Sequence, residues 1–295
     1  MKILFTILSL FISLSSLAHK ESFLPENNLK IGINPLAPTG ISEADFNAVQ
    51  EELKVIYVPM AAAQGGTLTF KSEWKSNTVN AYAQRFGVED EDGEEHAPFD
   101  DWRVIFLGGL ARHKHVTRDG FTLIVCHELG HHFGGTPTYD GQTSWASNEG
   151  QADTFSVSKC MRRLWEKADN AAAISGKTIP SVVTKTCSEQ WKTEAEKNLC
   201  LRIALASESI GNLFGSLVTF GRLPKFETPD TKVVSSTQFT HPKAQCRLDT
   251  YFQASICPVP YDIDFGKDDE TVGACHPKNG DVTGNRPLCW FHPKN

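Results

Sequence analysis

Apolar residues recur at helical spacing over most of this chain and alternate with polar residues over a shorter part. A period of three to four residues predicts an amphipathic helix, whereas alternation predicts a half-buried strand. The helical pattern covers about 41–56, 118–133 and 148–166, a helix pair from Pro180 to Phe220, and a helix after Pro242. Strands are predicted near 67–71, 79–84 and 103–107. The expected fold is therefore α+β, mainly helical, with a small antiparallel sheet.

The last part of the chain, residues 257–295, is rich in Pro, Gly and Asp and shows no sustained period. Such a composition predicts an irregular tail, and its cysteines predict that disulfides tie it down. No internal repeat or Gly/Ser linker divides the chain, and one domain can bury a core of this size. We expect a single domain over residues 19–295, with its core at 41–255.

Residues 1–18 have the pattern of a secretory signal peptide. Lys2 precedes an apolar stretch, and small residues stand at the two positions that signal peptidase reads, Ser16 and Ala18. The only later long apolar stretch, residues 199–220, is interrupted by two charged residues and predicts an amphipathic core helix. We therefore expect cleavage after Ala18, a secreted or periplasmic protein, and no membrane span.

All eight cysteines follow the expected cleavage site, which fits an oxidising compartment. Spacing alone does not determine their connectivity. The plausible local pairs are Cys187 with Cys200, Cys246 with Cys257, and Cys275 with Cys289, which leaves Cys126 and Cys160 either joined or free. Zinc binding by four cysteines is the alternative, but it is disfavoured because the sequence contains no Cys-x-x-Cys.

The formal net charge of −6 gives no reason to expect nucleic acid as a partner. Aromatic residues are scattered rather than interleaved with basic clusters, so a single-strand binding groove is also unsupported. The densest charge is the acidic run 89–95, between two predicted strands. A solvated hairpin loop explains this run, and a calcium site is the alternative, although the spacing matches no EF-hand.

The strongest chemical signal is His127-Glu128-Leu-Gly-His131. Residues four apart lie on one face of a helix, so both imidazoles can bind the same zinc ion. Glu128 follows the first histidine, where it can take a proton from the water that zinc activates. The apolar residues 121–126 predict a buried helix rather than a surface one, and Gly134-Gly135 predict its end. We expect one zinc ion per chain and Glu128 as general base.

A third ligand is expected from a second helix. Extending the motif to His-x-x-Gly-x-x-His would put a histidine at position 137, which is Pro137. Asn148 is instead placed to cap a helix that Glu149 opens, with Asp153 on the same face as Glu149. We expect Glu149 to bind zinc and Asp153 to fix the tautomer of a ligand histidine. The alternative is that these acidic residues only complement the helix dipole.

With these residues in place, the sequence resembles the gluzincin peptidases related to the CAAX prenyl protease and HtpX, over about residues 41–255. Their pattern is His-Glu-x-x-His followed by Glu-x-x-x-Asp, then His-Pro with Arg six residues after the His; His241, Pro242 and Arg247 reproduce the last block. The resemblance implies a zincin-like fold, a His241 donor to the oxyanion, and an Arg247 that orients the site or the substrate. Those peptidases carry several membrane spans, which this sequence does not predict, so lipidated or membrane-protein substrates are unsupported.

A softer match is Asn80-Ala81-Tyr-Ala, where the family has an Asn-Ala-x-Ala strand beside its active site. The resemblance implies that Asn80 and Ala81 lie on an edge strand that binds an extended peptide by β-augmentation. The alternating pattern is equally compatible with an ordinary sheet strand.

Together these features predict a secreted zinc metalloendopeptidase that hydrolyses peptide bonds of a peptide or protein substrate with an activated water. Two alternatives remain open at this point. One is a zinc-binding protein, chaperone-like or otherwise non-catalytic, which Glu128 argues against because a structural site needs no base. The other is a self-processing protease with a narrow partner.

Overall fold

The computed structural model describes residues 19–34, 36–89, 95–141, 144–218 and 222–293. The predicted signal peptide therefore lies outside the described residues. The elements are β1 His19–Ser22, α1 Glu43–Ala63, β2 Thr67–Glu73, β3 Ala81–Glu89, β4 Glu95–Leu107, α2 Gly108–Ala111, α3 Arg118–Phe133, α4 Glu149–Phe155, the π-helix η2 Ser156–Met161, α5 Arg162–Trp165, α6 Asn170–Ile174, α7 Ser181–Gln190, α8 Glu194–Ser216, α9 Ala244–Ser255 and the 3₁₀ turn η3 Pro277–Asn279. The α+β class is confirmed.

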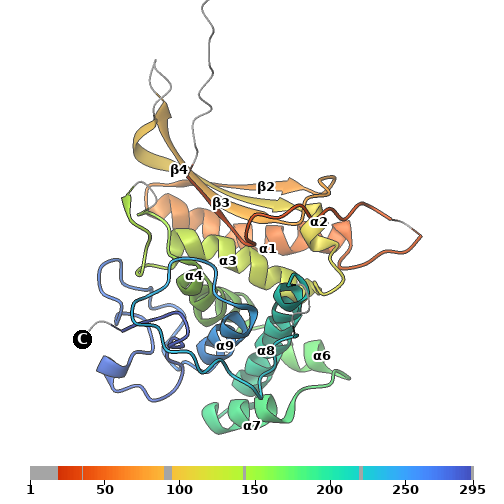
Figure 1. Cartoon of the computed structure of the whole chain (residues 1–295), viewed down its shortest axis with the longest axis vertical. Helices are drawn as coiled ribbons and strands as arrows, with labels where there is room; N and C mark the ends of the chain where they lie inside the picture. The colour runs from red at the N-terminus through yellow and green to blue at the C-terminus, as the bar shows by residue number, and fades with distance from the viewer. Residues whose placement is uncertain (1–18, 35, 90–94, 142–143, 219–221, 294–295) are drawn as a thin grey trace, which may run out of the picture.

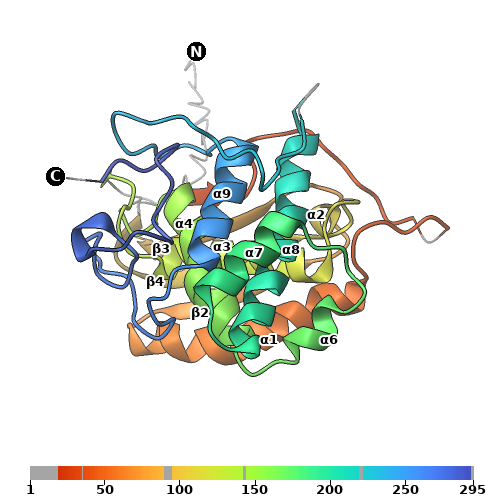
Figure 2. The same cartoon turned by 90° about the horizontal axis from the view of Figure 1, so that it is seen from below.

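Helix α3 lies at the centre of the molecule (Figure 1). One side of it packs against α1 and the sheet strands β3 and β4, and the other side packs against α4, η2 and α8. Every residue of α3 from Asp119 to Phe133 is buried, as its apolar sequence predicts. Seen from below, α4, α8 and α9 form the layer that covers α3 on the side away from the sheet (Figure 2).

The sheet has the strand order β1-β3-β4-β2. The pairs β1–β3 and β3–β4 are antiparallel, whereas β2 runs parallel to β4. The expectation of an antiparallel sheet is therefore wrong, because the sheet is mixed. Alternation in the sequence identifies which residues form a strand, but it does not identify the neighbour with which that strand pairs.

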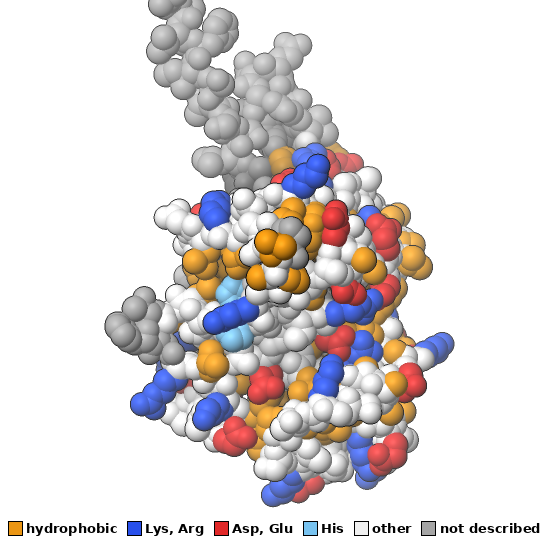
Figure 3. All heavy atoms as spheres, turned by 90° about the vertical axis from the view of Figure 1, so that its right-hand side faces the viewer, with side chains coloured by type: hydrophobic (Ala, Val, Ile, Leu, Met, Phe, Trp, Pro, Cys, Tyr) orange, Lys and Arg blue, Asp and Glu red, His pale blue; other side chains and the backbone are white. Residues whose placement is uncertain are grey.

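Strands β3 and β4 form the hairpin that was expected around the acidic run. The far ends of both strands project beyond the helices (Figure 1). Residues 90–94, which make up most of the candidate calcium segment, lie outside the described residues. Over the face shown in Figure 3, acidic and basic side chains are interspersed, as is typical of a solvated surface.

Helix starts follow the capping signals in the sequence. Thr117 caps α3 by accepting a hydrogen bond from the amide of Gly120, and Asn148 caps α4 as expected by accepting one from Gln151. The predicted helix 148–166 is continuous but contains the six-residue π-helix η2 directly after α4. Such π segments are frequent at functional sites.

Four disulfides join all eight cysteines: Cys126–Cys160, Cys187–Cys200, Cys246–Cys289 and Cys257–Cys275. The pairing of Cys187 with Cys200 is confirmed, and Cys126 and Cys160 are joined. The expected pairs Cys246–Cys257 and Cys275–Cys289 are wrong, and so is the alternative of a four-cysteine zinc site.

The physical reason for the unexpected pairing is the burial of Trp290. This indole donates to the Thr250 hydroxyl on α9 at 3.0 Å and is fully buried. Its burial carries the neighbouring Cys289 to Cys246, which lies one helical turn before Thr250. The tail that follows residue 257 is irregular, as expected, and lies beside α4 and α9 (Figure 1).

Among the described residues, no helix combines the length and apolar character needed to cross a bilayer. The long helix α8 is an amphipathic core helix, as predicted, and it also carries a buried arginine. Arg202 makes a two-pronged ion pair with Asp119 of α3, at 2.8 and 2.9 Å, and both side chains are nearly buried. This pair fastens α8 to the central helix.

We expect Arg202→Ala to lower the free energy of unfolding by about 3–5 kcal/mol, because the substitution leaves the Asp119 carboxylate buried without its partner. Lys197→Ala, on the same helix, breaks a mostly exposed pair with Glu194 and serves as the control, with an expected loss of at most about 1 kcal/mol. Denaturant unfolding of the two variants measures both values. Equal losses would contradict a structural role for the buried pair.

Candidate metal centre

Helices α3 and α4 bring the three predicted zinc ligands together. His127 and His131 lie one turn apart on α3, and Glu149 is the first residue of α4. The Nε2 atom of His127 lies 3.4 Å from Oε2 of Glu149, and Nε2 of His131 lies 3.7 Å from Oε1. One ligand atom from each of the three residues falls within a 4.8 Å span. The three residues can therefore hold a metal ion.

The spacing of these atoms fits zinc. Ligand atoms about 2.0–2.1 Å from a tetrahedral zinc ion lie about 3.4 Å from one another. The chemistry of the set fits too, because two imidazoles and one carboxylate leave a fourth position open for water, as in catalytic zinc sites.

Both histidines have an oxygen acceptor beside Nδ1, as metal-binding histidines do. The Nδ1 atom of His127 lies 2.8 Å from the Asp153 carboxylate, and Nδ1 of His131 lies 2.8 Å from the Ser147 carbonyl. A proton on Nδ1 that is donated to these oxygens leaves the Nε2 lone pair free for coordination. The predicted role of Asp153 therefore has a direct geometric basis.

Six polar atoms at the centre are buried and have no hydrogen-bond partner: Nε2 of His127 and His131, and both carboxylate oxygens of Glu128 and Glu149. Buried polar atoms are almost always paired, since an unpaired one costs the loss of its hydration. A cation among the Nε2 and Glu149 atoms, with a water beside Glu128, would satisfy this group.

The electrostatics of the ligands point the same way. Burial alone would lower the pKa of His127, but the hydrogen bond and charge of Asp153, together with Glu149, raise it to about 9. Burial lowers the pKa of His131 to about 4. The carboxylates thus attract one positive charge to this position, and a metal ion could supply that charge in place of a proton.

Glu128 is suited to act as a base. Its side chain is fully buried, and burial raises the pKa of its carboxyl group well above the ordinary value. A raised pKa brings a carboxylate closer to the range in which it can accept a proton from water and pass it on.

Arg247 and Tyr251, one turn apart on α9, hold Asp153 in place. Arg247 donates to both oxygens of Asp153, at 2.6 and 2.8 Å, and the Tyr251 hydroxyl donates to one of them at 2.7 Å. Arg247 also donates to the carbonyl of Phe23 at 3.0 Å. It therefore both orients the site and binds a peptide carbonyl. Tyr251 was missed in the sequence, although its spacing of four from Arg247 could have found it.

His241 lies in the loop before α9, at the mouth of the centre. Its Nε2 atom is 3.5 Å from Oε2 of Glu149 and 2.7 Å from the carbonyl oxygen of Ser22, to which it donates. The side chain is 24% exposed and lines a cavity, so it is accessible from outside the centre. The structure thus brings the predicted oxyanion donor to the ligand set.

Asn80 and Ala81 lie at the start of β3, but β3 is not an edge strand. Strand β1 covers its free side and pairs with residues 82–85. The expectation of an exposed edge is therefore wrong, because the chain's own residues 19–22 fill it; so short a stretch carries no periodic pattern that predicts a strand. Asn80 and Ala81 do bind a peptide backbone, which is that of Phe23 and Leu24, and this backbone is bent rather than extended.

The close approach of α3 and α4 requires a glycine inside the motif. A Cβ atom at Gly130 would lie 2.8 Å from the carbonyl oxygen of Ala152. The end of α3 is fixed similarly, since Gln151 of α4 donates to the carbonyl of Gly134 at 2.6 Å. The absence of a side chain at Gly130 therefore allows the two ligand helices to approach this closely.

His132, the third histidine of α3, belongs to a structural cluster instead. Its ring stacks on Trp102 and Trp145, and its two nitrogens bond to Arg85 and to the Arg103 carbonyl. Another group of potential ligands, formed by Asp230 with Cys246 and Cys289, has both of its sulfurs in a disulfide and offers no thiolate.

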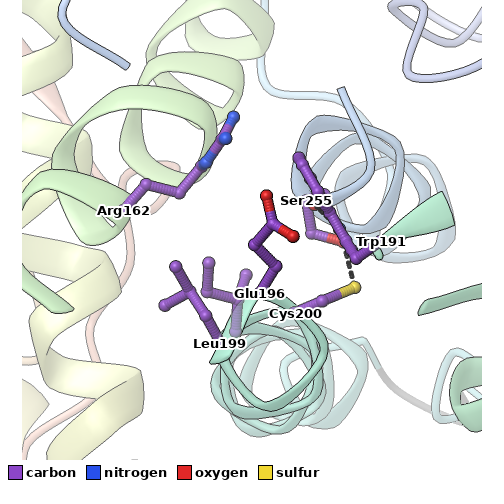
Figure 4. Close-up of a pocket in the computed structure, with 7 residues that line it drawn as sticks. Arg162, Trp191, Glu196, Leu199, Cys200 and Ser255 are labelled. Atoms are coloured by element: carbon purple, nitrogen blue, oxygen red, sulfur yellow. Dashed lines mark hydrogen bonds between the residues drawn. The ribbon is translucent and has the colours of Figure 1, made fainter. Parts of the chain in front are cut away.

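Two cavities help to locate the chemistry. One of about 500 Å³ borders the centre, where it is lined by His241, Arg247 and the residues that follow Leu24. The other, of about 20 Å³, lies between α5, α8 and α9, where Arg162 and Glu196 extend toward one hollow (Figure 4). The small cavity has room for about one water molecule. Of the cavities among the described residues, the one of about 500 Å³ is lined by His241 and Arg247, whereas others of similar size lie away from these two residues.

We expect Glu149→Ala to lose zinc, whereas Asp153→Asn keeps it with affinity lowered about 10–100-fold, as for other residues that orient a ligand. Glu194→Ala, an exposed carboxylate on α8, is the control and should bind zinc as the unmodified protein does. Metal content after dialysis against a graded chelator, with a thermal melt of each variant, measures the order. Undiminished binding by folded Glu149→Ala would place another group on the metal.

Comparison with known proteins finds no match: no family model, curated protein or solved structure matches the chain. The assignment of the centre therefore depends on its own residues and on the spacing of its motifs.

Proposed function

We propose that this protein is a zinc-dependent metalloendopeptidase of the gluzincin type. The observation that carries the proposal is the set of six buried, unpartnered atoms, four of which belong to a complete zinc ligand set and two to Glu128 beside it. A purely structural zinc site would close its fourth position and would need no buried carboxylate without a partner.

Zinc bound by His127, His131 and Glu149 would act as a Lewis acid on the carbonyl to be cleaved. Glu128 takes a proton from the attacking water and delivers it to the leaving nitrogen. His241 donates to the oxygen on which negative charge develops, and Arg247 donates to the next carbonyl along the peptide.

The motif resemblance supports the same activity. Three separate blocks of the sequence match the gluzincin pattern, and the structure brings all three to one point, from α3, α4 and the start of α9. Convergence of residues this far apart is not expected from matches that arise by chance.

A secreted location fits the four disulfides, since disulfides persist in oxidising compartments. Cleavage of a signal peptide near Ala18 is part of this proposal. The substrate we propose is a peptide or protein whose backbone groups bind the site residues, because Asn80 and Arg247 already bind backbone groups of Leu24 and Phe23.

A non-catalytic zinc-binding protein is the second candidate. The observation that favours it is that residues 22–24 lie over the centre and occupy the place of a substrate. The unpartnered carboxylate of Glu128 favours the enzyme instead, and substitution of this residue separates the two candidates.

Glu128→Gln should retain one zinc ion per chain and the fold, yet hydrolyse a peptide library about 10²–10⁴-fold more slowly, because the amide cannot accept the proton. Library digestion followed by mass spectrometry, with metal analysis of the same samples, measures both properties. Hydrolysis at the unmodified rate would remove Glu128 from the mechanism. A zinc-loaded unmodified protein that cleaves nothing would favour the non-catalytic candidate.

His241→Ala should lower kcat about 10²–10³-fold with little change in KM or zinc content, because a donor to the oxyanion is strongest in the transition state. Lys232→Ala, an exposed residue earlier in the same loop, is the matched control and should leave kcat unchanged. Steady-state kinetics decides the role. An unchanged kcat for His241→Ala, or loss of zinc from it, would exclude the oxyanion assignment.

A further inference from the structure

Residues Ser22 to Leu24 lie beside the metal centre, where β1 ends at Ser22 and the backbone bends at Phe23 and Leu24. Three residues that the sequence motifs assign to the site form hydrogen bonds to the backbone of this segment. His241 donates to the Ser22 carbonyl at 2.7 Å, Arg247 donates to the Phe23 carbonyl at 3.0 Å, and Asn80 makes two bonds to the backbone of Leu24, at 3.0 and 3.1 Å.

The register of these contacts singles out one peptide bond. On the carbonyl side of the Ser22–Phe23 bond, the oxygen accepts from the proposed oxyanion donor. On the nitrogen side, the Phe23 amide donates to the carbonyl of Ala81 at 3.1 Å. A peptide bond under hydrolysis needs a donor on its oxygen and a contact that positions its leaving nitrogen. The Ser22–Phe23 bond has both.

The side chain after this bond is enclosed. Phe23 is fully buried, with its ring 5.1 Å from the ring of His127, 5.1 Å from that of Phe214, and beneath the Arg247 guanidinium. Leu24 is also fully buried. The ring of Phe23 therefore fills a closed space between the rings of His127 and Phe214 and the guanidinium of Arg247.

An ordinary strand would not need these contacts. Pairing of β1 with β3 uses backbone groups alone, yet here an amide, an imidazole and a guanidinium from three different parts of the chain bind three consecutive residues. Side chains of a binding site contact the backbone of a bound peptide in this way.

We propose that this protein cleaves its own Ser22–Phe23 peptide bond, so that the first substrate of the centre is the chain's own N-terminal segment. The inference rests on the proposed peptidase function. It further assigns the specificity of the site, which is a segment with a large apolar residue on the carboxyl side of the bond.

The reaction is a simple hydrolysis. Water adds to the carbonyl carbon of Ser22 while Glu128 takes one of its protons; the C–N bond then breaks, and that proton passes to the nitrogen of Phe23. Ser22 ends as a carboxylate and Phe23 as a new amino terminus. Release of the residues before Phe23 removes β1 and uncovers the edge of β3 at residues 82–85.

The test compares the unmodified full chain with Glu128→Gln, each secreted from the same host and loaded with zinc. N-terminal sequencing and intact mass should show that the unmodified protein begins at Phe23 and that Glu128→Gln retains Ser22. Glu194→Gln, an exposed and otherwise equivalent change, should be processed like the unmodified protein. Hydrogen exchange provides a second measurement: β3 amides that pair with β1 should be protected in Glu128→Gln and exchange faster in the processed protein.

Phe23→Leu and Phe23→Asp test the pocket. The leucine variant should still be cut, whereas the aspartate variant should not, because its charge would be buried beside a guanidinium that is already paired with Asp153. Loss of folding in the aspartate variant would not affect the main comparison, in which both proteins keep Phe23. Cutting of Phe23→Asp at an unreduced rate would overturn the assigned specificity.

Two results would overturn self-cleavage. One is an unmodified, zinc-loaded protein that retains Ser22; the other is a Glu128→Gln protein that also begins at Phe23, since a peptidase of the host would then have made the cut. The peptide library separates this failure from that of the proposed function. If the protein that retains Ser22 digests the library, only the self-cleavage inference fails, and if it digests nothing, both fail.

Discussion

The constraint that governs this structure is the burial of unpaired polar atoms on its central helix. Six nitrogen and oxygen atoms of two histidines and two glutamates are hidden from water without hydrogen-bond partners. Their lost hydration would destabilise the folded state unless a cation were present. We infer that metal binding and stability are linked here, since an ion that binds only the folded chain stabilises it by mass action.

The rest of the molecule holds these atoms in register. The Cys126–Cys160 disulfide joins the ligand helix α3 to η2, and Gly130 lets α4 approach closely enough for Glu149 to face both histidines. The C-terminal tail braces α4 from the other side, where Arg286 donates to Gln151 at 2.7 Å. Rigid support of this kind is what a metal site needs, because small displacements of a ligand weaken binding and catalysis.

Local patterns in the sequence predicted the ligand helix, its end and the three residues proposed as ligands. A helical period fixes which side chains share a face, which places His127 and His131 together. The capping residue Asn148 marks the helix that Glu149 begins. The Glu128→Gln comparison is meaningful for the same reason, since that residue's position on α3 follows from the pattern. Strand partners and two of the disulfides could not be predicted in this way. They depend on long-range packing, such as the burial of Trp290, and on a short strand, β1, that has too few residues for a detectable period.

The N-terminal segment connects stability with specificity. Phe23 and Leu24 satisfy Asn80 and Arg247, two nearly or fully buried groups that would otherwise lose hydrogen bonds. Without these two residues Asn80 would lose two hydrogen bonds, and Arg247 would keep its bonds to Asp153 but lose one to a carbonyl. A peptide that replaced this segment would need the same carbonyl and amide groups at the same spacing, and a side chain that fits beside His127. The proposed self-cleavage and the proposed choice of other substrates thus depend on one set of contacts.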